Sequence, residues 1–82
     1  MYKIIKKIIN TWDPINLFPS APENEYYLEI REIYSFIKSK HDSCELAQKV
    51  KDVFTKSFGD IFQNTMEQCM EIANEINQRI NS

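Results

Sequence analysis

The sequence is poor in the residues and patterns on which β-rich, disulfide-stabilised and membrane-spanning proteins depend. Its single glycine, Gly59, argues against an all-β domain with many tight turns. Its two cysteines, Cys44 and Cys69, are fewer than a disulfide scaffold of this size carries. No apolar run approaches the roughly 18–20 residues of a membrane span, and residues 1–10 lack the pattern of a secretory signal. We therefore expect a cytoplasmic protein with reduced thiols.

The chain also lacks a large excess of positive or negative charge. Ten Lys and Arg residues stand against twelve Asp and Glu residues, for a net charge of −2. A nucleic-acid binder needs a basic stripe that displaces counterions from phosphates, so this balance disfavours nucleic acid as a partner. The lysines of residues 1–12 alternate with isoleucines, and such a segment can lie on a membrane surface. A small core accounts for the same apolar face more simply, so we expect no membrane partner.

What the chain does contain is enough apolar material for a core. Hydrophobic residues make up 43% and aromatic residues 12% of its 82 residues, which excludes a disordered chain. A chain of this length forms one small domain, here residues 1–82, and most large apolar side chains must enter its core. Because the apolar stripes described next are wide enough to cover one another, we expect a monomer.

Two helices are predicted in the first half of the chain from apolar residues at helical spacing. The first covers about residues 2–12 and ends before Pro14, because a proline disfavours helical geometry in the residue before it. The second begins near Asn24 and continues to about Ile37, with acidic residues in its first turn that complement the helix dipole. The charged residues expected to face solvent on this helix are Glu25, Glu29, Arg31 and Glu32.

The third helix has clear start and stop signals. Asp42 and Glu45 have the spacing of a capping box, and Ser43 is an equally good N-cap. An apolar stripe then continues to Phe58, and Gly59 follows where a left-handed residue commonly ends a helix.

The fourth helix starts in the region 60–65 and ends near Ile80. Residues 64–67 offer a second start, in which case the first turn is separate. The expected fold is therefore all-α: a compact bundle of four helices with a structured, proline-rich loop between the first two.

That loop, residues 13–24, contains all three prolines and directly follows the only tryptophan. Loops of this length without regular structure are uncommon in small domains unless they are functional or packed by their own side chains. We predict a structural role, in which apolar and proline residues pin the loop across the helix ends. The residues expected to do so are Trp12, Asp13, Pro14, Leu17, Phe18 and Pro22.

Several short sequence segments, taken together, are similar to segments of a known protein family. They are Ile8-Ile9-Asn10-Thr11-Trp12-Asp13-Pro14-Ile15, Ala21-Pro22-Glu23-Asn24-Glu25-Tyr26, Glu29-Ile30, Phe58-Gly59 and Cys69-Met70-Glu71-Ile72-Ala73. Together they resemble the YugE-like family of short bacterial proteins of unknown function. The resemblance implies a small all-α cytoplasmic protein and contributes no established catalytic residue. Asn16 stands where the family often has glycine, and asparagine tolerates a left-handed backbone. Tyr27 stands where an acidic residue is frequent.

Three carboxylates near the loop, Asp13, Glu23 and Glu25, could together attract a hard cation such as calcium. Their spacing matches no EF-hand, and turn formation and helix capping explain them more simply.

Of the other reactive side chains, His41 is explained as a turn residue and Cys69 as a small core residue. Cys44 lies in the first turn of the third helix, where the helix dipole favours a thiolate, but no lysine or histidine is clearly aimed at it. We therefore predict no catalysis, no cofactor and no metal, with weak metal binding by the loop carboxylates as an alternative.

A binding surface is the remaining functional hypothesis. Tyr27 lies off the apolar stripe of the second helix, and Glu23 and Glu25 lie within one turn of it. Tyrosine is enriched at protein interfaces, so these three residues form the candidate surface for another protein. Exposed carboxylates there would steer a basic partner. An immunity-like protein that neutralises a toxin is an alternative form of the same hypothesis, by analogy of size and charge alone.

Overall fold

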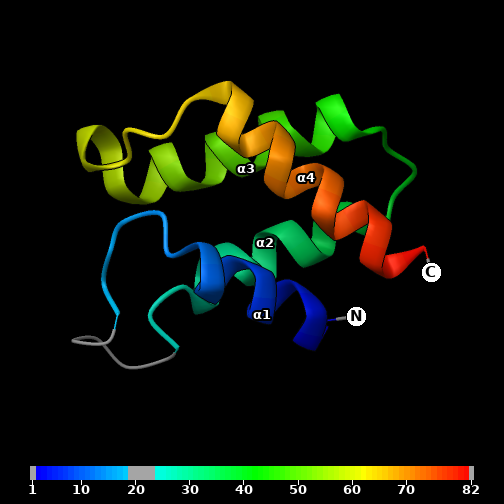
Figure 1. Ribbon diagram of the computed structural model, residues 1–82, viewed down its shortest axis with the longest axis horizontal. Coiled ribbons are helices and arrows are strands. Elements are labelled where there is room, and N and C mark those ends of the chain that lie inside the picture. The colour runs from blue at the N-terminus through cyan, green and yellow to red at the C-terminus, as the bar shows by residue number, and fades with distance from the viewer. Residues whose placement is uncertain (1, 19–23, 82) are drawn as a thin grey trace.

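Four α-helices in two layers form the fold, as a computed structural model that describes residues 2–18 and 24–81 shows (Figure 1). Helix α1 pairs with α2 and α3 pairs with α4, while α2 also contacts α3 and α1 contacts α4, so each helix touches two others. Within the described ranges the chain has no β-strand, and the prediction of an all-α bundle is confirmed. The elements are α1 (Tyr2–Trp12), α2 (Tyr27–Ile37), α3 (Ser43–Phe58), a 3-10 turn η1 (Gly59–Ile61) and α4 (Met66–Ile80).

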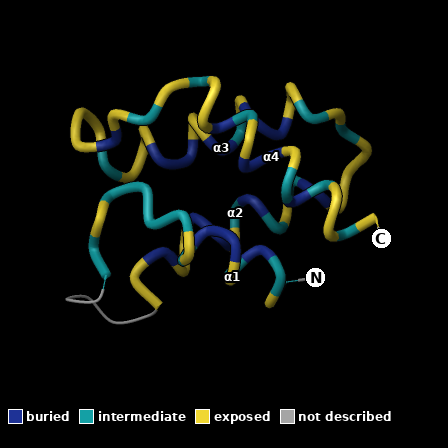
Figure 2. The backbone as a smooth tube through the Cα atoms, viewed as in Figure 1, coloured by how far each residue is buried: buried dark blue, intermediate teal, exposed yellow. Residues whose placement is uncertain are grey.

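The core lies between the two layers, where all four helices turn their apolar stripes inward (Figure 2). Each helix contributes side chains that are fully buried, among them Ile9, Ile33, Val50 and Ile76. The spacing of these residues along the chain is the one that predicted the helices. Burial of such stripes supplies most of the stability of helices this short, because they are marginal in isolation.

Phe54 of α3 is the centre of an aromatic cluster. Its ring meets those of Trp12 and Tyr26 edge-on, with centroids 5.7 and 5.8 Å away. It stacks on Phe58 and Phe62 at 6.0 and 5.5 Å. Aromatic pairs at these separations contribute beyond their buried area. The cluster joins α1, α3, the start of α2 and the segment that precedes α4.

The ends of α3 and α4 are set by local signals. A capping box between Asp42 and Glu45 begins α3, as predicted. A second capping box, between Thr65 and Gln68, begins α4, so the later of its two predicted starts is correct. Gly59 has φ +57° and ψ −132°, a combination that essentially only glycine adopts without strain, and it ends α3.

His41 fastens the turn between α2 and α3 to α4. Its Nδ1 lies 2.8 Å from the Ser39 carbonyl oxygen, and its Nε2 lies 3.1 Å from Asn77 Oδ1. The Asn77 amide nitrogen donates to Ser43 Oγ at 3.1 Å, so one side chain of α4 holds both the turn and the start of α3. The histidine is partly buried and its role in this turn is structural.

One expectation for α2 is wrong: Glu29 does not face solvent. Its side chain is only 5% exposed, and its Oε2 accepts a hydrogen bond from Ser57 Oγ of α3 at 2.9 Å. Glu29 shares a helical line with Ile33 and Ile37, at positions i, i+4 and i+8, and that line faces the core. Because α2 packs against both α1 and α3, its buried stripe is wider than a helix with one neighbour requires.

Trp12→Ala is expected to lower the free energy of unfolding by about 3 kcal/mol, as truncation of a large core aromatic does. The tryptophan is partly buried, and its ring packs on those of Phe54 and Phe62. Urea unfolding followed by circular dichroism measures the change. Ile61→Ala is the matched control, because Ile61 is 67% exposed and its truncation should cost at most about 0.5 kcal/mol. Equal unfolding midpoints for the two variants would contradict the structural role of Trp12.

Candidate functional site

The loop after α1 is organised by the carboxylate of Asp13. Oδ1 accepts from the Leu17 amide at 2.8 Å and from the Tyr26 hydroxyl at 2.5 Å, and Oδ2 accepts from the Phe18 amide at 3.1 Å. The Asp13 backbone has φ +47°, and its amide still donates to the Ile9 carbonyl oxygen at 2.8 Å. Aspartate is among the few residues that adopt this conformation readily, because its short side chain bonds to nearby amides.

Tyr26 connects this loop to the core. Its side chain is fully buried, and its hydroxyl accepts a hydrogen bond from the Ile15 amide at 3.2 Å while it donates to Asp13. Its ring packs edge-on against Phe18 and Phe58, with centroids 5.5 and 6.1 Å away. Tyr26 lies one helical turn before Ile30 on the buried face, but no signal in the sequence identified its hydroxyl as the partner of Asp13, 13 residues earlier.

The pKa values of Asp13 and Tyr26 shift in opposite directions in the folded state. Burial raises the pKa of the Asp13 carboxyl, but hydrogen bonds from Tyr26, Leu17 and Phe18 outweigh it, so the pKa lies below its usual value. Burial, followed by the hydrogen bond to Asp13, raises the pKa of the Tyr26 hydroxyl well above its usual value. The folded state therefore favours an ionised Asp13 and a neutral Tyr26.

Other described loop residues contact the core or the segment before α4. Pro14 presents its carbonyl oxygen to the Asn64 side-chain amide, which donates at 3.0 Å. Leu17 and Phe18 are partly buried against the core. Asn16 has φ +58°, in agreement with the expected left-handed backbone. Pro22 lies outside the described residues. From Trp12 to Phe18 the loop is thus tied both to the core and to the segment before α4.

The structure does not bring Asp13 and Glu25, two of the three carboxylates considered as cation ligands, into a cluster of metal ligands among the described residues. Both oxygens of Asp13 already accept hydrogen bonds from the loop and Tyr26, Glu25 is exposed, and Glu23 lies outside the described residues. Over residues 2–18 and 24–81 there is no group of three or more His, Cys, Asp or Glu side chains suited to a metal ion. Of the cysteines, Cys44 is exposed, and Cys69 is buried with the pKa of its thiol raised by that burial.

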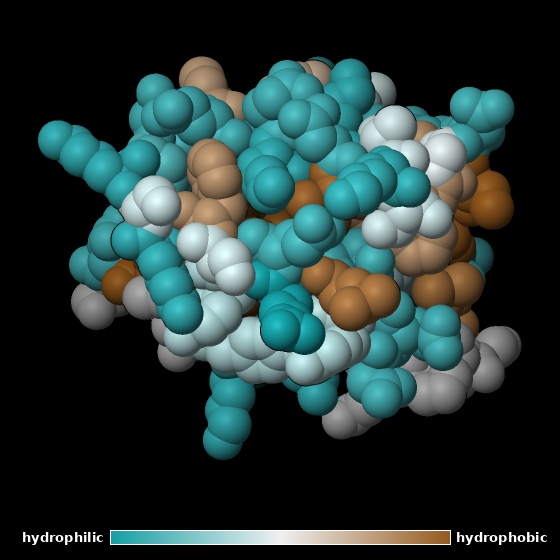
Figure 3. All heavy atoms as spheres, turned by 180° about the vertical axis from the view of Figure 1, so that it is seen from behind, coloured by the Kyte–Doolittle hydropathy of each residue, from teal (hydrophilic) through white to brown (hydrophobic). Residues whose placement is uncertain are grey.

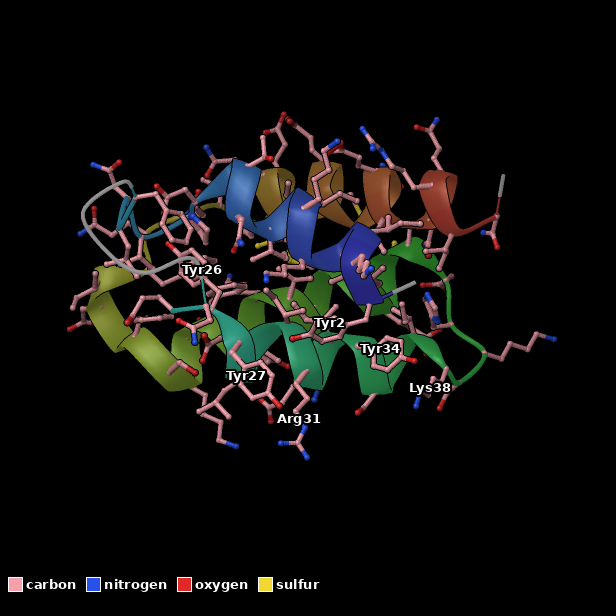
Figure 4. The ribbon with its side chains drawn as sticks, turned by 90° about the horizontal axis from the view of Figure 1, so that it is seen from below. Tyr2, Tyr26, Tyr27, Arg31, Tyr34 and Lys38 are labelled. Carbon is pink, nitrogen blue, oxygen red and sulfur yellow. The ribbon has the colours of Figure 1, made fainter. Side chains whose placement is uncertain are left out.

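The candidate partner surface lies on the outer side of α2. Tyr27 is 46% exposed and the next residue, Leu28, is 64% exposed. Figure 4 shows the Tyr27 and Arg31 side chains pointing away from the bundle, whereas Tyr34 lies beside Tyr2 of α1. These two tyrosine rings meet edge-on, with centroids 5.6 Å apart. The exposed apolar part of this face is therefore the first turn of α2.

Sequence reasoning identified Tyr27 but missed Leu28. The signal was present, because residue 28 lies off the line of Tyr26, Ile30 and Ile33 that faces the core. The helix also starts at Tyr27 rather than near Asn24. The residues before it form a turn, in which the Tyr27 amide donates to the Asn24 carbonyl oxygen at 3.1 Å.

A groove of about 630 Å³ runs between α2 and α3 beside Leu28. Its apolar surface comes from Leu28 and from the partly buried Phe36, and its hydroxyl groups include that of Ser57. Figure 3 shows the face of the molecule formed by these two helices, where hydrophobic residues are exposed among mostly hydrophilic ones. The charged residues that line the groove are Arg31, Glu32, Lys49 and Lys56.

Asp13→Asn is expected to lower the free energy of unfolding by about 1–3 kcal/mol at pH 7, because it removes a charged acceptor from three hydrogen bonds. The Asp13 pKa is lowered in the folded state, so this contribution is complete above the unfolded pKa of about 3.9 and is lost as the pH falls through the folded pKa. The difference between wild type and variant should therefore shrink below about pH 4. Chemical unfolding at pH 7, 4 and 2.5 measures it, with the exposed Asp60→Asn as control. A difference independent of pH would contradict the role of the Asp13 charge.

Glu29→Gln is expected to raise the free energy of unfolding by about 1 kcal/mol. Within the described part of the chain Glu29 Oε1 is buried and has no hydrogen-bond partner, and an unsatisfied buried charge costs more than a neutral amide of the same shape. Thermal and urea unfolding of wild type and variant give the change, and the exposed Glu71→Gln serves as a control for loss of one negative charge. A destabilised Glu29→Gln would show that the carboxylate is better satisfied than this geometry implies.

None of the helices in the described residues combines the length and hydropathy that a bilayer crossing requires. Comparison with curated proteins and comparison with solved structures each gave no match. One protein-family model does match, described as "Domain of unknown function (DUF1871)". It covers residues 3–79, which include the loop, the groove and all four helices except the first residue of α1 and the last residue of α4. The chain therefore belongs to the DUF1871 family of domains of unknown function.

Proposed function

We propose that this protein is a non-catalytic protein-interaction module that binds its partner on the outer side of α2. One observation carries the proposal: Tyr27 and Leu28, two adjacent large apolar side chains, are 46% and 64% exposed beside a groove. Large side chains of this kind supply much of the affinity of an interface once a partner buries them. Among the described residues the only other exposed large apolar side chain is Ile61, which lies in η1.

The state of the reactive side chains supports binding rather than catalysis. Both ring nitrogens of His41 face oxygens of the fold, and Cys69 is buried. The competing proposal, weak metal binding by Asp13, Glu23 and Glu25, is less well supported because the Asp13 carboxylate already accepts three hydrogen bonds. General bases and metal ligands both need a lone pair that is available to the reacting group or ion.

The proposal has narrower parts. We propose a monomer that acts in the cytoplasm and has a protein as its partner, without nucleic acid or membrane, in line with the resemblance to the bacterial YugE-like proteins. An immunity-like role is one form of such a module, in which the partner is a toxin. Of the three residues first expected in the interface, Glu25 and Tyr27 are exposed, and Glu23 lies outside the described residues.

Tyr27→Ala is expected to leave the free energy of unfolding within about 0.5–1 kcal/mol of wild type, as for a surface substitution, yet to reduce partner capture. Immobilised wild type and Tyr27→Ala are compared in parallel on lysate of the source cells, with quantitative mass spectrometry of the retained proteins. The control is Asn74→Ala, because Asn74 is exposed on α4, in the other layer of the fold. A specific partner that all three proteins retain equally would contradict this site.

A further inference from the structure

We propose that the groove between α2 and α3 binds an acidic, amphipathic segment of the partner protein. The inference rests on the proposed function and names the chemistry that the partner presents. An acidic segment differs from the earlier expectation of a basic partner, which was drawn from Glu23 and Glu25 alone.

The groove follows the two helices for about two turns. On α2 its lining residues Leu28, Arg31 and Phe36 recur at i, i+3 and i+8, which is one helical face about 12 Å long. On α3 the lining residues Lys49 and Lys56 are seven positions apart and lie on one line. A groove of this length suits a short helix or an extended peptide rather than a single small ion.

The charge of the lining is opposite to that of the chain. Arg31, Lys49 and Lys56 stand against one carboxylate, Glu32, whereas the whole chain has a net charge of −2. Lys56 Nζ lies 3.8 Å from Glu32 Oε1, and both side chains are well exposed, so this pair is weak. Arg31 has no ion-pair partner among the described residues, and its side chain points outward (Figure 4). The positive excess therefore favours carboxylates on the occupant.

The apolar part of the groove requires an occupant that has aliphatic side chains as well as acidic ones. Leu28 is 64% exposed, and the Phe36 ring is partly buried, with Lys49 Nζ 6.0 Å from its centroid. An aliphatic side chain of the partner can cover Leu28 and the edge of Phe36, while carboxylates one turn away reach Arg31 and Lys49. This combination describes an amphipathic segment with aliphatic side chains on one face and acidic side chains flanking them, and a purely acidic tail would leave Leu28 exposed.

Two synthetic peptides test the inference. Both have 14 residues and the same leucine positions on one helical face, and they differ in that one has Glu and the other Lys at the flanking positions. Titrations into ¹⁵N-labelled full-length protein are followed by amide chemical shifts. The Glu peptide should shift amides in residues 28–36 and 49–57 and bind about tenfold more tightly than the Lys peptide, with an affinity that falls as salt is added.

Paired charge-reversal variants identify the groove as the cause. Arg31→Glu with Lys49→Glu should abolish the preference for the Glu peptide. Lys3→Glu with Lys7→Glu changes the net charge equally on exposed positions of α1 and should retain it. Circular dichroism shows whether each variant keeps its helices.

Several results would overturn the inference: equal affinity for the two peptides, no binding of either, or an equal loss of preference in both charge-reversed variants. Shifts in the groove on raising the protein concentration without peptide would assign it to a second copy of the chain. The two proposals can fail separately. Equal capture by wild type and Tyr27→Ala rejects the interface around Tyr27, whereas Tyr27-dependent capture without a peptide preference rejects only the acidic segment.

Discussion

The hydrogen bond between Tyr26 and Asp13 is the contact on which the path of the first half of the chain depends. It joins the residue after α1 to the residue before α2, and so closes the loop that pairs these two helices. Tyr26 also stands at the N-terminal end of the buried stripe of α2, which includes Ile30 and Ile33. Because Tyr26 is turned into the core, the next two residues, Tyr27 and Leu28, are turned outward. The structural loop and the exposed surface thus adjoin the same buried contact.

Much of the fold was predictable because its signals are local. Helix spacing, the Asp42–Glu45 capping box and the position of Gly59 each involve residues within a few positions of one another. The left-handed backbone of Asn16 was predictable for the same reason, since short polar side chains tolerate that conformation. Signals of this kind specify where helices begin and end, but they do not specify which faces of two helices meet.

The remaining features depend on how the helices meet. Glu29 was expected in solvent because it is charged, and it is buried because α2 packs against α3 as well as α1. Likewise, Arg31 and Lys49 are 18 positions apart and line one groove only after α2 and α3 pack together. The positive charge of the groove lining is a tertiary property, because it combines side chains of α2 and α3. Helical periodicity identified the exposed Tyr27 and the solvent-facing Arg31, but it could not show that lysines of α3 line the same groove.

The contact between α1 and α4 has a consequence for how the protein is made. The isoleucine face of α1 is covered in part by α4, whose residues Met66–Ile80 are synthesised after those of the other three helices. At about 5–20 residues per second, the ribosome completes α4 several seconds after it completes α1. Until α4 has been made, the part of the α1 apolar face that α4 covers stays exposed, and the four-helix bundle cannot close. A chain that stalls before α4 is therefore not a folded domain. It exposes an amphipathic segment with an apolar face, which chaperones and proteases can bind.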